Sequence, residues 1–427
     1  MMAYFNFKLK IFILPICLIL NAPYIHYCHA NHYFKIPDSV KEPRLAHQWL
    51  TSIEIDTSFT KSTKAYNSLK NKVPLFDLHG THQMQAITDG LCKDFTNDID
   101  LLMIQLALLP GNTSFANLSV DGSYSLTELN FAATQNLING FFLHVSMPLK
   151  FFNIQDIVFE DLSPEDIYPT NQEPLWLSFK KNMASILAHY GMSTDAWKQH
   201  GIGDLLVTTG WTISYQDTVE IDFIDATLEA GLLLPTSKKA DLANVFALPF
   251  GHEKHLGFPL RASLALGIYE WLTFGCSFDG LIFLDKKHDE FRMKISEKQS
   301  TIFLPTKDQA TVNRGSLWNA QLFMKADHVV QGLSVTFGYT FMHQQRSFVT
   351  PFDNNLFSYT IVNNDNRFKA YTMHTIHLLL EYDFTEQNWS YGPRVAFGFH
   401  KSVSGKQVFD GYTINGIGGL EIAWDYL

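Results

Sequence analysis

The stretch Leu260–Gly280 reads LRASLALGIYEWLTFGCSFDG, and its pattern decides between a helix and a pair of strands. A helix that crosses a bilayer needs about 20 predominantly apolar residues, but Arg261, Glu270 and Asp279 interrupt this run. Apolar residues recur here at every second position, which is the period of a strand, and the alternation breaks and restarts at Tyr269–Trp271. We therefore predict two antiparallel strands joined by a tight turn.

The same period of two recurs along the rest of the chain. Each segment has about the 9 to 11 residues that a tilted transmembrane strand requires, with large apolar side chains on one face and polar ones on the other. The segments begin near Leu50, Leu129, Phe141, Leu205, Ile224, Leu260, Leu272, Trp318, Leu333, Ile376, Val395 and Leu420. The prediction is an all-β fold, a transmembrane antiparallel up-and-down β-barrel of about 12 strands, within a range of about 12–14.

The connections between these segments alternate between short and long. The links at 138–139, 216–218, 269–271 and 327–331 are short, whereas those at 152–202, 235–258, 285–317 and 343–371 are long. A soluble β-sandwich has no reason to collect its long loops at one end, but an outer-membrane barrel has short periplasmic turns and long extracellular loops. Both termini then belong to the short-turn side. Aromatic residues suited to an interfacial girdle lie near turns and the chain end, namely Tyr269, Trp271, Trp424 and Tyr426.

The first 30 residues read as an export signal. Lys8 and Lys10 precede an apolar run, IFILPICLIL, that is too short to span a bilayer, and Cys28–Ala30 resembles a small-x-small cleavage site. We predict a signal peptide at 1–30 and one barrel domain at 31–427, in the outer membrane of a Gram-negative-type bacterium. An uncleaved anchor helix is the alternative.

Charge and cysteine content limit the partners. The formal net charge of −10 argues against nucleic acid, and four cysteines in 427 residues do not make a disulfide-stapled fold. The expected partners are outer-membrane lipid, the outer-membrane assembly machinery and a small solute of unknown identity. Cys276 falls on the apolar face of its strand, where it should act as a small hydrophobic residue.

Two segments do not follow the strand period. Asp98–Leu109 and Leu175–Tyr190 have apolar residues at helical spacing. The first lies in a long connection between Thr60 and Thr127. Each helix is either a plug or lid that controls a pore, or a helix packed on its own outside loop.

The polar faces of the predicted strands carry the candidate lumen-lining residues. These are Glu54, Asp56, Glu128, Asp204, Asp225, Glu229, Arg261, Asp279, Lys325, Glu381, Asp383 and Arg394. Because carboxylates outnumber bases, an open lumen should favour cations modestly over anions. The alternative is that these charges pair across neighbouring strands and hold the barrel in register.

Histidine pairs and nucleophile motifs give little support to catalysis. His374 and His377 are three apart on a predicted strand, so they point to opposite faces and cannot share an ion. The pairs His79/His82 and His252/His255 are expected to be solvated loop histidines. A G-x-S-x-G motif is absent from the sequence. We therefore predict no enzyme, no cofactor and no metal site.

One segment resembles a known family. The sequences GIGDLLVTTGW (Gly201–Trp211) and ATLEAGLLLPTSKK (Ala226–Lys239) resemble a pattern in the fatty-acid and aromatic-hydrocarbon transport barrels. The resemblance covers about 40 residues and carries over no ligand-contacting residue. It implies a monomeric barrel that passes small hydrophobic molecules and has an N-terminal plug.

These observations lead to a function class. The sequence predicts an outer-membrane barrel that acts as a pore or transport protein for small solutes, hydrophobic ones among them. A surface adhesion or structural barrel that acts through its long loops is the alternative. A hydrolase with its active site at the outer rim is a third, weaker hypothesis.

Overall fold

The computed structural model describes residues 49–83, 117–163, 173–216, 221–269, 271–284, 286–299, 302–384 and 391–424. The predicted signal peptide at 1–30, the helix predicted at Asp98–Leu109 and the C-terminal residues 425–427 lie outside these described residues.

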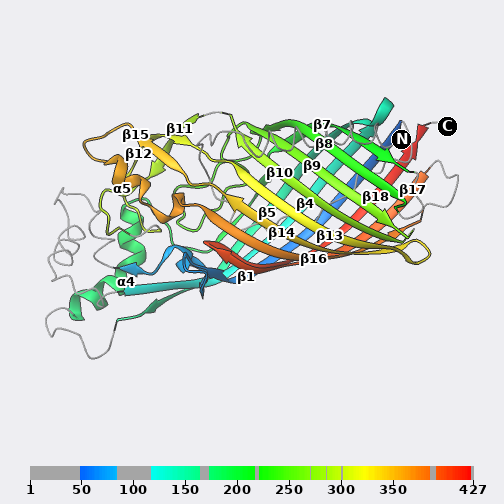
Figure 1. Cartoon of the computed structure of the whole chain (residues 1–427). Coiled ribbons are helices and arrows are strands. Elements are labelled where there is room, and N and C mark those ends of the chain that lie inside the picture. The colour runs from blue at the N-terminus through cyan, green and yellow to red at the C-terminus, as the bar shows by residue number, and fades with distance from the viewer. Residues whose placement is uncertain are drawn as a thin grey trace.

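The described chain forms a closed barrel of twelve antiparallel strands (Figure 1). The barrel strands are β1 (Leu50–Tyr66), β4 (Asn117–Asn136), β5 (Phe141–Asp161), β7 (Leu205–Tyr215), β8 (Phe223–Leu234), β9 (Gly257–Ile268), β10 (Leu272–Phe283), β13 (Leu317–Val330), β14 (Leu333–Gln344), β16 (Tyr371–Asp383), β17 (Tyr391–Lys406) and β18 (Val408–Ala423). Each pairs with the next barrel strand along the chain, and β1 closes the ring by pairing with both β4 and β18. The prediction of an up-and-down barrel of about 12 strands is confirmed.

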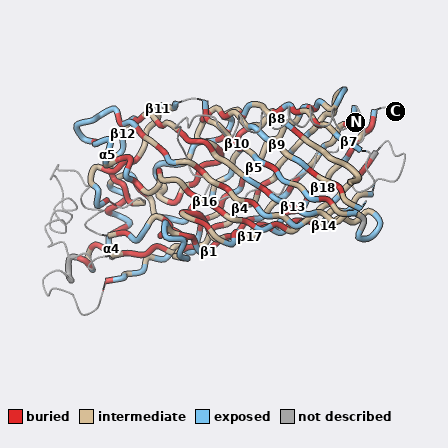
Figure 2. Tube along the Cα trace, in the orientation of Figure 1, coloured by how far each residue is buried: buried red, intermediate tan, exposed pale blue. Residues whose placement is uncertain are grey.

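Alternation along the strands sorts the side chains into an outward and an inward face. Large apolar residues are exposed on the outward face of every barrel strand pair, and Figure 2 shows exposed positions along the whole barrel wall. Examples are Ile53, Ile55, Phe131, Leu143, Leu228, Leu264, Phe274, Leu322, Phe337, Ile376, Phe397 and Leu420. We call this surface the apolar belt. Cys276 belongs to it as an exposed free cysteine, as the sequence predicted.

Tight turns join the strands at one end, which we call the short-turn end. The β4–β5 turn is the 3-10 helix η2 (Ile138–Gly140), where Asn139 has a φ of 56°. Gly140 has a φ of 80°, and a Cβ there would overlap the backbone oxygen of Thr212. Both ends of the described chain lie at this end of the barrel (Figure 1).

Longer connections with their own secondary structure lie at the opposite end, the loop end (Figure 1). Their elements are β2 (Lys72–Pro74), η1 (Leu75–His79), β3 (His82–Gln83), α4 (Glu173–His189), β6 (Trp197–Ile202), β11 (Lys286–Arg292), β12 (Lys307–Asn313), β15 (Phe348–Pro351), α5 (Tyr359–Asn363) and η4 (Asn366–Phe368). β11, β12 and β15 form a separate three-stranded sheet. None of the helices in the described ranges is long and apolar enough to cross a membrane.

Two connections are shorter than the sequence predicted, because β1, β4 and β5 extend further toward the loop end. β1 continues to Tyr66 and β4 begins at Asn117, so the strands occupy both ends of the range Thr60–Thr127. β5 likewise runs to Asp161. These extensions were not predicted from the sequence, because the alternation of polar and apolar residues reverses along them. In these extensions the inward side chains are apolar and buried, such as Tyr124, whereas the outward ones are polar, such as Ser125.

Aromatic residues gather at the short-turn end, as predicted for an interfacial girdle. Tyr269 is 70% exposed and Trp271 is 53% exposed in the β9–β10 turn. Trp424 donates from Nε1 to Thr51 Oγ1 at 2.7 Å, and Trp211 donates to the Asn139 carbonyl at 3.0 Å. Trp424 thus has an exposed ring and a bonded N–H, which suits the boundary between hydrocarbon and water.

A charge placed in the middle of the apolar belt should prevent stable insertion. Leu322 is 62% exposed and pairs with Cys276 near the centres of β13 and β10. We expect Leu322→Arg to lower the free energy of unfolding in phospholipid vesicles by about 2–4 kcal/mol. Val329→Arg, close to the β13–β14 turn, should cost about 0–1 kcal/mol. Denaturant titration of both variants checks this, and equal losses would contradict the assignment of the belt.

Candidate functional site

The inward face of the barrel is the candidate site, and it holds most of the residues that the sequence singled out. Eleven of the twelve occupy inward positions on barrel strands. They are Glu54 and Asp56 on β1, Glu128 on β4, Asp225 and Glu229 on β8, Arg261 on β9, Asp279 on β10, Lys325 on β13, Glu381 and Asp383 on β16, and Arg394 on β17. Asp204 lies elsewhere, between β6 and β7.

Arg394 joins three adjacent strands by ion pairs. Its guanidinium contacts the Glu54 carboxylate across the barrel closure, and its Nε lies 3.9 Å from Glu421 Oε1. The side chains of Arg394 and Glu54 are only 12% and 14% exposed. Glu421 is a further inward carboxylate on β18. Because β1 and β18 close the ring, this cluster bridges the seam of the barrel.

Arg261 makes a second cluster of the same kind. Its Nε donates to Asp279 on β10, and its Nη1 lies 3.7 Å from Glu229 Oε2 on β8. The Thr208 hydroxyl donates to the same Glu229 from β7. Four consecutive strands, β7 to β10, are therefore linked through one arginine and two carboxylates.

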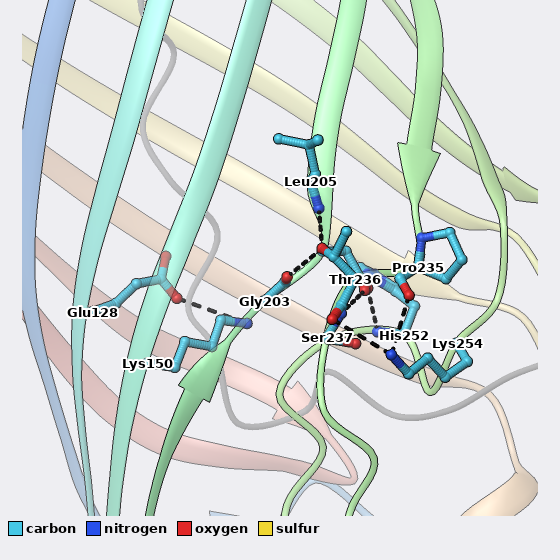
Figure 3. A network of polar contacts seen from close by, with 10 residues as sticks. Glu128, Lys150, Gly203, Leu205, Pro235, Thr236, Ser237, His252 and Lys254 are labelled. Carbon is cyan, nitrogen blue, oxygen red and sulfur yellow. Dashed lines mark hydrogen bonds and ion pairs between the residues drawn. The ribbon is translucent and has the colours of Figure 1, made fainter.

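The two inward lysines also have carboxylate partners. Lys150 Nζ lies 3.7 Å from Glu128 Oε2 across the β4–β5 pair, a contact drawn in Figure 3. Lys325 Nζ lies 2.9 Å from Asp327 Oδ1. Each of the four inward bases thus has a carboxylate partner. For Lys150, Arg261 and Arg394 the partner lies on another strand, as the hypothesis of cross-strand pairing requires, whereas Lys325 and Asp327 share β13.

Pairing still leaves the inward face acidic. Among the described residues, the inward positions within the part of the barrel that carries the apolar belt hold ten carboxylates against four bases. The carboxylates are Glu54, Asp56, Glu128, Asp225, Glu229, Asp279, Asp327, Glu381, Asp383 and Glu421. Fixed negative charge inside a low-dielectric wall raises the local concentration of cations.

The structure brings together two histidines that sequence spacing did not connect. His377 on β16 faces His400 on β17, with their Nδ1 atoms 2.8 Å apart, and both are buried. His374 points outward, as its spacing from His377 predicted. Its Nδ1 lies 2.6 Å from Tyr339 Oη. The His377–His400 contact depends on the register of β16 and β17, which cannot be read from the spacing along one strand.

Asp204 lies between β6 and β7, where it joins loop segments instead of belonging to a strand. Its carboxylate accepts hydrogen bonds from Ser237 N at 3.1 Å and from His252 N at 2.6 Å, and it contacts His252 Nδ1 at 2.9 Å. Thr236 Oγ1 donates to the Gly203 carbonyl and accepts from Leu205 N. We call these residues the rim lock. The sequence placed Asp204 on a strand face because strand-like alternation continues through Leu205.

The rim lock explains why the two motif segments occur together. Gly203 and Asp204 come from the Gly-x-Gly-Asp segment, whereas Thr236 and Ser237 come from the Pro-Thr-Ser segment. The segments bond to each other directly, so their pairing has a structural role at the loop end. Hydrogen bonds and the neighbouring His252 hold the pKa of Asp204 well below its usual range, against the raising effect of burial.

A hydrophobic cover lies at the loop end. The apolar stripe of α4, predicted from its helical spacing, is buried against inward residues of β4 and β5 and against the 243–250 loop. The stripe comprises Trp176, Phe179, Met183, Ile186 and Leu187. Its partners include Tyr124, Phe152, Trp197, Phe246 and Phe250. Figure 1 shows α4 at the loop end of the barrel.

Arg292 ties this cover together. Its guanidinium donates to the carbonyls of Leu242, Leu304 and Pro305, and to those of Tyr190 and Gly191 after α4. Arg292 is only 8% exposed. One buried side chain thus joins the end of α4, the β8–β9 connection and the segment before β12.

The loop histidines are buried or half-buried, so the expectation of solvated side chains was wrong. His82 and His255 are 0% and 1% exposed, and His252 is bonded to Asp204. Burial lowers the pKa of His79 to about 3 and that of His82 to about 4, which keeps both neutral at pH 7. The loops carry a packed core of their own, and loop position alone did not reveal it. Within the described ranges, no group of three or more His, Cys, Asp or Glu is placed to hold a metal ion.

The comparisons with known proteins gave similarities to solved structures at low sequence identity. No family model and no curated protein matches it. It is similar to an outer-membrane channel from Pseudomonas putida F1, with 13% identity, a TM-score of 0.46 and coverage of 92% of this chain and 98% of that one. It is also similar to the NanC porin, with 9% identity, a TM-score of 0.29 and coverage of 70% of this chain and 93% of that one. A third similar structure is the Pseudomonas putida toluene transporter TodX, with 10% identity, a TM-score of 0.28 and coverage of 89% of this chain and 90% of that one.

The rim lock should weaken in acid because of His252. Burial lowers the pKa of its imidazole to about 4, against an unfolded value near 6.5. Between about pH 4 and 6.5, His252 therefore binds more protons when the rim lock is open than when it is closed. Stability is fully present above about pH 6.5 and falls by up to about 3 kcal/mol as the pH drops to 4. Hydrogen exchange at the Ser237 amide should accelerate in this window.

His252→Gln should remove that dependence and leave exchange faster at both pH values. His288→Gln, a loop histidine that contacts Thr311, is the matched control and should keep the wild-type pH profile. An unchanged profile in His252→Gln would assign the titration to another group.

Loss of Arg394 should destabilise the seam of the barrel. Arg394→Met leaves Glu54 and Glu421 close together without their shared base, and we expect a loss of about 3–5 kcal/mol. Adding Glu54→Gln should recover part of it. Lys64→Met, which breaks an exposed ion pair with Asp121, should cost less than about 1 kcal/mol. Denaturant unfolding in vesicles measures all three, and a neutral Arg394→Met would contradict a role in closure.

Proposed function

We propose that this protein is an outer-membrane pore that transports small solutes. The observation that carries the proposal is an acidic, polar inward face enclosed by a closed barrel whose outer wall is an apolar belt. Such a wall is stable in lipid, since every strand has two hydrogen-bonded neighbours. The short-turn end is then periplasmic and the loop end extracellular. Outer-membrane lipid and the assembly machinery of the outer membrane are the partners that this location implies.

The size of the barrel supports a narrow passage. Eight-stranded barrels are filled by side chains, whereas barrels of about sixteen or more strands hold a wide aqueous channel. Twelve strands lie between these limits, and here charged side chains extend inward from most of them. The excess of carboxylates supports a preference for cations among charged solutes.

The cover at the loop end supports a gated or filtered entry. Its core is apolar, with aromatic side chains from α4, β5, β6 and the 243–250 loop. A small solute with an apolar part would be compatible with this surface, as the resemblance of Gly201–Lys239 to hydrocarbon-transport barrels also implies. Packing of the loops into one core favours a role in the barrel's own passage over adhesion by free extracellular arms.

Conductance tests the proposal directly. We expect the chain from Asn31, refolded and inserted into a planar bilayer, to give steady current steps with a cation preference under a salt gradient. Asp225→Asn with Asp383→Asn removes two inward charges, so it should lower the cation-to-anion permeability ratio by about half.

Glu160→Gln with Glu297→Gln is the matched control. Both residues are exposed outside the inward face, so the same change in net charge should leave the ratio unaltered. A well-inserted but silent barrel would reject an ion-conducting pore. Equal ratios in both double variants would reject the carboxylates as the cause of selectivity.

A further inference from the structure

His377 and His400 belong to a hydrogen-bonded chain that crosses five neighbouring strands. Thr340 Oγ1 on β14 lies 2.7 Å from His377 Nε2, and His400 Nε2 lies 2.9 Å from Asn415 Oδ1 on β18. Asn415 Nδ2 in turn lies 3.3 Å from Asp56 Oδ1 on β1. All five side chains occupy buried inward positions.

The carboxylate at one end fixes the direction of this chain. An ionised Asp56 only accepts, so the Asn415 atom beside it must be the amide nitrogen. The Asn415 oxygen then accepts from His400, which places the His400 proton on Nε2. In neutral His400 the Nδ1 atom therefore carries a lone pair, and this lone pair points at His377 Nδ1.

The two ring nitrogens have the spacing of two ligands on one metal ion. Zn²⁺ binds imidazole nitrogen at about 2.0–2.1 Å, so two such ligands lie about 2.8–3.4 Å apart for bond angles between about 90° and 109°. The observed Nδ1–Nδ1 separation of 2.8 Å is close to this range. Each outer nitrogen already has an oxygen partner, the arrangement that orients metal-binding histidines.

A second observation points to the same place. Thr375 and Ser402 form the cross-strand pair next to His377 and His400 on β16 and β17. Both are fully buried, and within the described residues neither hydroxyl oxygen has a hydrogen-bond partner. Two imidazole nitrogens and two hydroxyl oxygens thus lie on one inward patch.

We propose that His377 and His400 bind a divalent transition-metal ion, with Zn²⁺ or Cu²⁺ as the ions best matched to imidazole. His377 donates from Nε2–H to Thr340 in this state, so both Nδ1 atoms are available to the ion. The Thr375 and Ser402 hydroxyls or water complete its coordination. Asp56 acts through Asn415 to hold the His400 ring. Gly398 keeps the space open, because a Cβ there would overlap Asn415 Oδ1.

This site goes beyond the proposed transport function and does not depend on it. The test is calorimetric titration of the refolded full chain with ZnCl₂ in lipid vesicles. We expect one ion per chain, with affinity reduced at least tenfold in His400→Gln and by about 10–100-fold in Asn415→Leu, which keeps both histidines. Heat-modifiable gel migration verifies that each variant forms a barrel.

His374→Gln is the matched control, since His374 is on the same strand as His377 but faces outward. Its affinity for Zn²⁺ should equal that of the wild type. Titration of the His377→Gln/His400→Gln double variant to the same stoichiometry and affinity would overturn the proposal and assign binding to other histidines.

A spectroscopic measurement on the wild type keeps the test independent of folding in the variants. Bound Cu²⁺ should show electron paramagnetic resonance with hyperfine coupling to two nitrogen donors. A spectrum without nitrogen coupling would overturn the proposal and leave His377 and His400 joined by a hydrogen bond alone.

Discussion

The pairing of β1 with both β18 and β4 is the contact on which the rest of the structure depends. A bilayer offers no water to an unpaired backbone N–H or C=O, so an open sheet edge within it is excluded. Once the ring is closed, a side chain can point only outward or inward. Closure therefore turns a simple alternation in sequence into an apolar belt and an acidic interior. Arg394 reinforces the same seam through Glu54 and Glu421.

The reversal of alternation along β4 and β5 marks the border between two environments. On the side of this border toward the short-turn end, Phe131 faces outward and Glu128 faces inward, as suits lipid outside and polar groups inside. Toward the loop end, Tyr124 faces inward to the cover while its outward neighbours Ser123 and Ser125 are polar. The same strand thus serves a membrane wall and an ordinary protein core. The position of the switch sets where the apolar belt ends.

This reversal also explains what sequence analysis could and could not predict. The barrel, its strand number, its two unlike ends and the inward positions of eleven candidates follow from the period of two. The extensions of β4 and β5 were not predicted, because the sequence analysis looked for strands with apolar residues on the outward face and polar residues on the inward face, and the extensions have the reverse pattern. Asp204 was misplaced because its neighbours imitate a strand, and the burial of His82 depends on contacts made by distant loops. The His377–His400 contact joins residues 23 apart in the chain, and it depends on the register between β16 and β17.

Structural pairing and electrostatic selectivity are compatible in this barrel, because the numbers of the two charges differ. Arg261 and Arg394 each hold two carboxylates, and the inward lysines hold one each. These contacts engage every inward base among the described residues, yet ten carboxylates against four bases leave the interior negative. Buried ion pairs in a low dielectric fix the strands in register, since breaking one leaves a charge uncompensated. The remaining negative charge is the basis of the cation preference that we propose for this barrel.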